Sequence, residues 1–250
     1  MKTYRTFLIL VLGLILAAPT CEQTAKEIVK KADEKARGKT SIAEMTITTT
    51  RPKWTRSMDL KAWTKGNDFA LILIQSPAKD EGTSFLKRKK EVWNWLPSLD
   101  RNIKLPPSMM SQSWMGTDFT NDDLVKESSI VEDYEHLLVG EEMIGDRRCF
   151  KIEMTPKPEA AVVWGKLITW IDQKDYLQLR VEFYDEFGEL VNEMTGSDIK
   201  MIGGRLLPTK MVMIPSDKEG HKTEIIYKNI VFDSPIDDNF FSTANMARVQ

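Results

Sequence analysis

Apolar and polar residues alternate with a period of two along most of the chain after residue 38. The clearest alternation lies in residues 177–185, where apolar side chains from Leu177 to Phe183 are separated by more polar ones. Successive side chains of a β-strand point to opposite faces, so this pattern predicts strands with one buried face. Residues 69–74 are apolar at every position, which predicts a strand that is covered on both faces.

Short turn signals separate these segments at steady intervals, for example at Gly145-Asp146, Gly188 and Gly203-Gly204. Strands joined by tight turns, without a helix between each pair, predict an antiparallel meander rather than a parallel sheet. A single sheet of this size has to curl. The sequence therefore predicts a mainly β protein, a half-open antiparallel β-barrel of about ten or eleven strands.

One helix is predicted before the strands, at residues 24–37. Thr24 can cap its first turn, Glu27 completes a capping box, and Gly38 follows its last turn. Its apolar stripe is narrow, which favours a position at the edge of a larger body. This helix and residues 97–125 are the two segments available to close the concave side of a curled sheet.

The middle of the chain, residues 84–120, contains a loop that is unusually apolar. Loops normally run over the surface and are polar, so this one must cover a core or a ligand. Methionine is flexible and suits a surface that repacks around varied apolar partners. We expect a helical or loop lid at residues 97–125, and permanent packing of the loop on its own sheet is the alternative. The apolar residues of this segment are Leu105, Met109, Met110, Trp114, Met115 and Phe119.

The N-terminus has the features of a secretory signal peptide, which we assign to residues 1–21. Lys2 and Arg5 precede an apolar run over residues 7–18 that is too short to span a bilayer. Residues 22–250 are then predicted to form a single domain.

The chain contains two cysteines. Cys21 stands where a lipoprotein would be acylated, but Pro19 and Thr20 before it match that signal poorly, so a lipid anchor at Cys21 is the alternative to a freely secreted protein. Cys149 is expected to be a buried free thiol. The count excludes a disulfide framework.

Composition excludes several classes of function. The formal net charge of −2 over 250 residues gives no basic surface for nucleic acid. The two histidines, His136 and His221, belong to no metal-binding motif, so neither a metal nor a cofactor is expected.

Catalytic motifs are equally scarce. Ser84 and Lys87 fit the S-x-x-K pattern of serine-acylating enzymes, but its companion motifs are incomplete and both residues lie in a β pattern rather than on one helix face. We therefore expect a protein that is not an enzyme, and a hydrolase acting through Ser84 is a minor alternative.

The central segment resembles a known family. It reads V-W-N-W-L-P-S at residues 92–98, S-M-M at 108–110 and M-G-T-D-F-T-N-D-D-L at 115–124. These motifs are similar to the signature of the outer membrane lipoprotein-sorting (LolA-like) proteins, and G-G-R-L-L-P-T-K-M at 203–211 agrees with the family downstream. The resemblance covers most of the chain after the signal peptide. Thr117 departs from the serine expected at that position.

The resemblance implies a LolA/LolB-like half-open barrel with an apolar cavity for the acyl chains of a lipid or lipoprotein. It further implies a periplasmic carrier that moves this cargo between envelope membranes, with an inner-membrane transporter and an outer-membrane acceptor as partners and no catalytic residues. The alternative is an envelope sensor or transporter-associated interaction module with a filled barrel. The residues that we expect to line the cavity or form its lid are Leu71, Leu73, Trp93, Trp95, Met109, Met110, Trp114, Met115, Leu179, Val181 and Phe183.

Overall fold

The computed structural model describes residues 23–126 and 129–249. Its strands are β1 (Thr40–Arg51), β2 (Trp54–Lys65), β3 (Phe69–Ser76), β4 (Ser84–Arg88), β5 (Glu91–Leu96), β6 (Arg101–Lys104), β7 (Tyr134–Ile144), β8 (Arg147–Pro156), β9 (Lys166–Asp172), β10 (Gln178–Tyr184), β11 (Leu190–Ile202), β12 (Arg205–Pro215) and β13 (Lys222–Phe232). The helical elements are α1 (Ala25–Arg37), η1 (Pro97–Leu99), η2 (Pro107–Met109), η3 (Asp122–Lys126), η4 (Asp238–Phe240) and α2 (Thr243–Met246).

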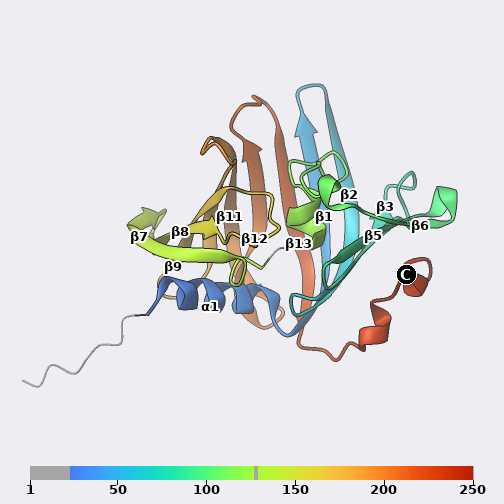
Figure 1. Cartoon of the computed structure of the whole chain (residues 1–250), viewed down its shortest axis with the longest axis horizontal. Helices are drawn as coiled ribbons and strands as arrows, with labels where there is room; N and C mark the ends of the chain where they lie inside the picture. Colours follow the sequence, from blue (N-terminus) through green and yellow to red (C-terminus); the bar gives the residue numbers. More distant parts are fainter. Residues whose placement is uncertain (1–22, 127–128, 250) are drawn as a thin grey trace, which may run out of the picture.

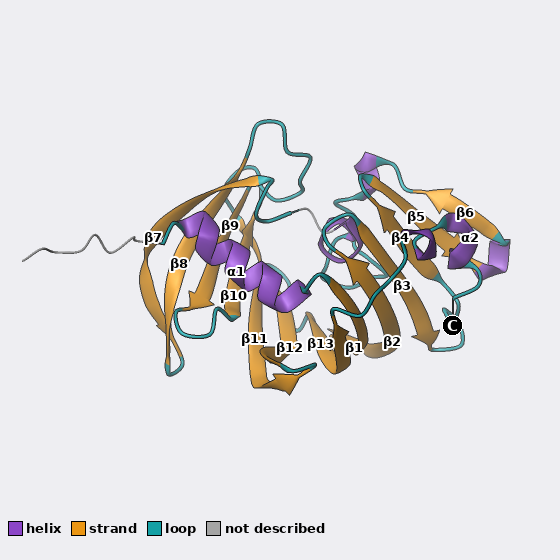
Figure 2. Ribbon diagram, turned by 90° about the horizontal axis from the view of Figure 1, so that it is seen from below, coloured by secondary structure: helices purple, strands orange, loops and turns teal. Residues whose placement is uncertain are grey.

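All thirteen described strands form one antiparallel sheet in the order β6-β5-β4-β3-β2-β1-β13-β12-β11-β10-β9-β8-β7. Each pair in this order joins strands that are consecutive in sequence, except the pair of β1 with β13, and the consecutive strands β6 and β7 do not pair. The sheet curls around a concave side and leaves β6 and β7 as separate edges (Figures 1 and 2). This confirms the predicted half-open antiparallel barrel.

The strand count differs from the prediction of ten or eleven because short strands carry little pattern. The sequence Arg-Asn-Ile-Lys of β6 lies inside the segment predicted to be lid, and all four of its residues are exposed. No apolar alternation could therefore mark this strand.

The sheet order also explains why the chain has a lid. Residues 105–133 connect the two edge strands, β6 and β7, so this connection has to cross the open side of the sheet. A segment held against the concave face must supply apolar side chains to it. Met110, Trp114 and Phe119 are buried there as part of the main core, as the apolar composition of the loop predicts.

The N-terminal helix forms as predicted. Thr24 and Glu27 make the reciprocal capping box, and Gly38 follows Arg37 with a positive φ of 70°. Its predicted edge position is wrong, because Ile28 and Val29 are fully buried in the main core. Figure 2 shows α1 lying across the open side of the curled sheet. Its narrow apolar stripe therefore packs into the main core.

A second hydrophobic cluster lies on the convex face of β2 to β5, beneath the C-terminal segment. Leu71 and Leu73 of β3 point into this cluster, and Phe241 stacks on Phe69 with a ring centroid separation of 5.3 Å. Ile74, from the same strand, belongs to the main core on the concave face. The prediction that residues 69–74 are covered on both faces is thus confirmed.

Two expectations about the ends and cysteines can be placed. The predicted signal peptide at residues 1–21, with Cys21, lies outside the described residues. Cys149 is a buried free thiol, as expected, and burial raises its pKa to about 11. Within residues 23–126 and 129–249, no helix is long and apolar enough to cross a membrane.

Candidate ligand cavity and its lid

A cavity of about 400 Å³ lies between the concave face of the sheet, α1 and the lid. This volume is within the range of roughly 300–1,000 Å³ typical of small-molecule sites. Most of the residues around it are apolar and come from strands on both sides of the seam between β1 and β13. Those from the strands include Met45, Ile47, Leu60, Ile72, Met154, Leu167, Val181, Phe183, Met211 and Ile225.

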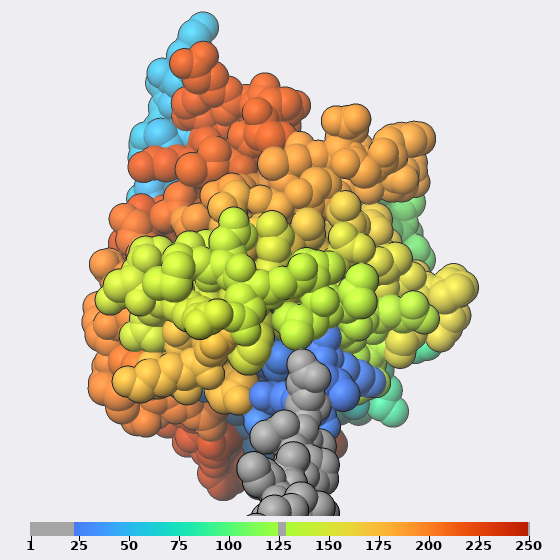
Figure 3. All heavy atoms as spheres, turned by 90° about the vertical axis from the view of Figure 1, so that its left-hand side faces the viewer, coloured from blue at the N-terminus to red at the C-terminus, as the bar shows by residue number. Residues whose placement is uncertain are grey.

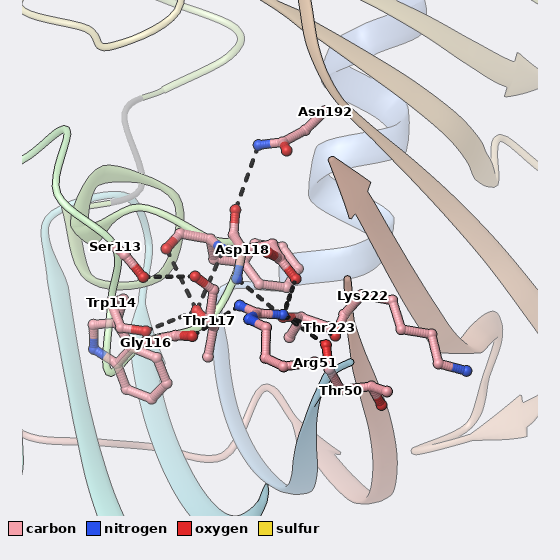
Figure 4. Close-up of polar contacts among 11 residues, drawn as sticks. Thr50, Arg51, Ser113, Trp114, Gly116, Thr117, Asp118, Asn192, Lys222 and Thr223 are labelled. Atoms are coloured by element: carbon pink, nitrogen blue, oxygen red, sulfur yellow. Dashed lines mark hydrogen bonds and ion pairs between the residues drawn. The ribbon is translucent and has the colours of Figure 1, made fainter. Parts of the chain in front are cut away.

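A polar anchor at Asp118 fixes the lid over this cavity (Figure 4). Arg51, the last residue of β1, contacts the Asp118 carboxylate with an Nη1–Oδ2 distance of 3.0 Å. Thr223 of β13 donates its hydroxyl to the same oxygen at 2.7 Å and accepts the backbone N–H of Asp118 at 2.9 Å. The side chains of Arg51 and Asp118 are only 10% and 6% exposed, so the pair is nearly dry.

The tight turn before Asp118 is held by bonds within the lid. Trp114 donates its backbone N–H to the Phe119 carbonyl at 2.8 Å, and the Thr117 hydroxyl donates to the Trp114 carbonyl at 2.7 Å. Gly116 adopts a positive φ of 78°, which favours glycine, and its carbonyl accepts from Arg51 Nη2 at 2.9 Å. The M-G-T-D-F-T motif therefore encodes the turn and anchor of the lid, and Thr117 supplies the hydroxyl that a serine would.

A second polar contact lies at the far end of the lid. The partly buried Asp123 carboxylate accepts hydrogen bonds from Trp164 Nε1 at 2.7 Å and from the Thr120 backbone N–H at 2.8 Å. Burial outweighs these bonds and raises the pKa of Asp123 to about 6. The pKa of neighbouring Tyr134 is also raised, first by burial and then by the charges of Asp122 and Asp123. All four of these side chains, Trp164 included, contact the cavity.

Three of the predicted cavity residues line it in the structure. Trp114 reaches it from the lid, and Val181 and Phe183 reach it from β10. Met109, Met110 and Met115 belong to the lid and pack against the main core, but they do not line the cavity. Whether any of these residues binds a ligand stays a prediction.

The other five predicted residues face away from the cavity, and the structure corrects their assignment. Leu71, Leu73, Trp93 and Trp95 lie in the convex cluster beneath the C-terminal segment. Leu179 packs in a third cluster with Cys149 and Trp170. A strand that is apolar on both faces gives no sequence signal for the face that lies on the concave side of the sheet. The prediction of Leu71 and Leu73 as cavity residues is therefore wrong by one position, and Ala70 and Ile72 line the cavity instead.

Sequence reasoning also missed much of the actual lining. Ile47 and Leu60 belong to strands that were recognised, but no pattern within one strand assigns its apolar face to a cavity rather than to filled core. Asp33 and Arg37 on α1 were missed because the helix was placed at an edge. In β2, Met58, Leu60 and Ala62 alternate with Asp59, Lys61 and Trp63, and this alternation is a sequence signal that could have placed Leu60 on a buried face.

Ser84, the serine of the S-x-x-K pattern, lies in the interior of the protein. It is fully buried on β4, and its hydroxyl donates to the Met246 carbonyl at 3.0 Å. Among the described residues there is no group of three or more His, Cys, Asp or Glu side chains that could hold a metal ion. His136 has a lowered pKa because it is partly buried, and its ring bonds to the Ile130 carbonyl at 2.7 Å.

The fold and cavity together define a class of protein: a lidded, half-open β-barrel with an internal apolar pocket. A family model described only as an uncharacterized protein matches residues 66–248. Three solved structures share the fold over almost their whole length. The chain belongs to the family that this model describes, and its fold is the LolA-like fold.

The first of these structures is a DUF1329 family protein from Desulfovibrio piger, 24% identical, with a TM-score of 0.80 over 89% of this chain and 97% of that chain. The second is a domain from Vibrio parahaemolyticus described as an outer membrane lipoprotein-sorting protein, 25% identical, with a TM-score of 0.78 over 90% and 98%. The third is a LolA superfamily protein from Nitrosomonas europaea, 24% identical, with a TM-score of 0.77 over 89% and 99%. No curated protein matches the chain in sequence.

Proposed function

We propose that the protein is a periplasmic carrier that holds the acyl chains of a lipid or lipoprotein in its cavity and moves them between envelope membranes. The observation that carries this proposal is the apolar cavity of about 400 Å³ beneath the lid. Each buried methylene contributes roughly 0.8 kcal/mol, so an open apolar space is sufficient to bind an acyl chain. The name of the structurally similar Vibrio domain supports the same kind of cargo.

The lid has the construction of a gate. It is held by polar contacts at Asp118 and at Asp123, and the buried indole N–H of Trp114 has no hydrogen-bond acceptor among the described residues. An unsatisfied buried donor costs about 1–3 kcal/mol, and opening the lid would let water satisfy it. This cost makes the closed state of the lid less stable than its apolar packing alone would. A gate that has to open for cargo requires a closed state of this kind.

An interaction module with a filled barrel is the alternative function, and the unfilled cavity argues against it.

We further propose that the protein is not an enzyme and that its partners are an inner-membrane transporter and an outer-membrane acceptor. The buried, hydrogen-bonded Ser84 supports the first of these statements. Unchanged hydrolytic background in Ser84→Ala would agree with it, and loss of a measurable esterase activity would contradict it.

The test is native mass spectrometry of protein purified from its own envelope, followed by organic extraction of any bound mass. A lipid or acylated peptide that co-purifies with the protein, and that is lost when Ile72 or Val181 is replaced by Asp, would support a carrier. Leu137→Asp is the matched control, because Leu137 is an exposed strand residue that does not line the cavity. A clean protein mass and no uptake of offered phospholipid would favour the interaction module.

A further inference from the structure

A separate polar recess of about 180 Å³ lies beside the apolar cavity. It is bounded by α1, by the turn between β2 and β3, and by the segment that leads into β7. Figure 3 shows α1 (blue) lying directly against the yellow-green segment on this side of the molecule. The polar side chains of the recess are Lys30, Asp33, Glu34, Arg37, Asn67 and Glu132.

The recess and the cavity share two wall residues, Asp33 and Arg37. These two side chains form an ion pair one helical turn apart, with an Nη2–Oδ1 distance of 3.2 Å, and they are 17% (Arg37) and 14% (Asp33) exposed. Ser41 and Thr64 also line the cavity, and their hydroxyl oxygens are 2.7 Å apart. The cavity therefore becomes polar at the end where α1 passes into β1.

This end is opposite the lid anchor. Strand β1 begins at Thr40, beside the C-terminal end of α1, and finishes at Arg51, which holds the lid. Figure 1 shows the same separation, with α1 below and the lid above. An amphiphile whose acyl chain fills the apolar space can therefore place its polar end at α1 without opening the lid anchor.

The recess presents charges of both signs. Lys30 lies 3.8 Å from Glu34, and Lys26 beside the recess lies 3.0 Å from Glu132. All four of these side chains are well exposed, and exposed pairs of this kind contribute little to stability. These four side chains can therefore exchange their present partners for the charges of a ligand at a small cost in free energy. The lysines can then face an anionic group of the ligand, and the glutamates can face a cationic group.

We propose that the gap between α1 and the β2–β3 turn is the portal through which a bound phospholipid extends its head group, and that this head group is zwitterionic. The acyl chain lies in the cavity, the phosphate lies towards Lys30 and Arg37, and the cationic group lies towards Glu34 and Glu132. This inference rests on the proposed carrier function and adds to it the lipid class and the direction in which the lipid lies.

Two photoreactive phosphatidylethanolamine probes test the orientation, one with a diazirine in an acyl chain and one with a diazirine in the head group. The acyl probe is expected to label peptides that contain Ile72 or Val181, and the head-group probe to label peptides that contain Asn67 or Glu132. Head-group labelling of residues 112–118, with the acyl label still in the cavity, would overturn the portal and leave the carrier function intact. Absence of labelling by both probes would count against both proposals.

A variant tests the head-group class. Replacing Glu34 and Glu132 together by Gln removes the carboxylates expected to face the cationic group, so the preference for phosphatidylethanolamine over phosphatidylglycerol should fall several-fold in a competition read by native mass spectrometry. Glu135→Gln with Glu186→Gln is the matched control, because these exposed residues are not part of the recess. Equal preference in both double variants, with both proteins folded, would contradict a zwitterionic site.

Discussion

At the scale of single residues, Asp118 joins the lid to β1 and β13. Its carboxylate is shared by Arg51 and Thr223, and its backbone N–H and carbonyl are both bonded to other strands. A buried ion pair contributes little relative to an apolar replacement of both partners, but removal of one partner leaves a buried charge uncompensated.

We predict that Asp118→Asn lowers the free energy of unfolding by about 3 kcal/mol, because Arg51 then keeps its charge in a nearly dry site without a carboxylate. Urea denaturation measures this difference. Asp238→Asn is the matched control: the side chains of Asp238 and of its partner Lys65 are 59% and 37% exposed, so less than about 1 kcal/mol should be lost. An equal effect of the two substitutions would show that the Asp118 anchor is not special.

Asp123 should give the protein a pH dependence of its own. Its pKa is raised to about 6 in the folded state from an ordinary value of 3.8, so between these values the folded protein binds more protons than the unfolded chain. The free energy of unfolding should then fall as pH rises from about 4 to about 6 and should change little further above that range.

Denaturation midpoints measured across this range, for the native protein and for Asp123→Asn, test the assignment. The variant should lose this part of the pH profile because position 123 no longer titrates. Asp146→Asn, at an exposed hairpin turn, should retain the profile. A profile that is identical in all three proteins would assign the dependence to another group.

At the scale of elements, the C-terminal segment behaves as a part of the core although it contains only short helices. Phe240 contacts Trp63 at a ring centroid separation of 5.4 Å, and Phe241 is completely buried against Phe69. The convex face of β2 to β5 is thereby shielded from water, which explains how those strands can be apolar on both sides.

Replacement of Phe241 by Ala is therefore expected to cost about 3–5 kcal/mol, because it leaves a cavity beneath the segment and exposes Leu71 and Leu73. Phe187→Ala is the matched control. Phe187 is 82% exposed at a hairpin tip, so its removal should change stability by no more than about 0.5 kcal/mol. Urea denaturation compares the two, and a loss below 1 kcal/mol for Phe241→Ala would mean that the segment is not an integral part of the core.

Helices and strands with a strong local pattern could be predicted from the sequence. Whether their apolar side chains face the concave or the convex side of the sheet could not. The helix at Thr24 to Arg37 and the double-sided strand at residues 69–74 follow directly from capping residues and periodicity. The concave position of α1 and the outward direction of Leu71 depend on how distant strands curl around one another. Alternation within a strand carries no information about that curl, so the lid was recognised while most of the lining was not.

At the scale of the whole molecule, the cavity is a volume that the core leaves unfilled. Ala43, Ala62 and Ala70 line it, and larger side chains at these positions would occupy part of the space. Small residues facing a common centre from adjacent strands are thus as important for the cavity as the apolar residues around them.

We predict that Ala62→Phe abolishes lipid uptake while the protein stays folded, because the ring projects into the cavity and takes the place of the acyl chain. Ligand binding to the native state alone raises the unfolding temperature. A thermal shift with offered phosphatidylethanolamine should therefore be seen for the native protein and for Ala78→Phe, whose site is an exposed turn, but not for Ala62→Phe. A shift of equal size in all three would place the lipid elsewhere.

The seam between β1 and β13 has a consequence for the time course of folding. Ser41 pairs with Phe232, so the sheet cannot be continuous until nearly the whole chain has been made, whereas the other pairs join strands that are close in sequence. Contacts between distant segments slow folding because a long loop must close before they form. The hairpins on either side of the seam can form before β1 and β13 pair. Pairing of these two strands then completes both the barrel and the cavity. The barrel of this chain therefore stays open until its last strand, β13, is available to pair with β1.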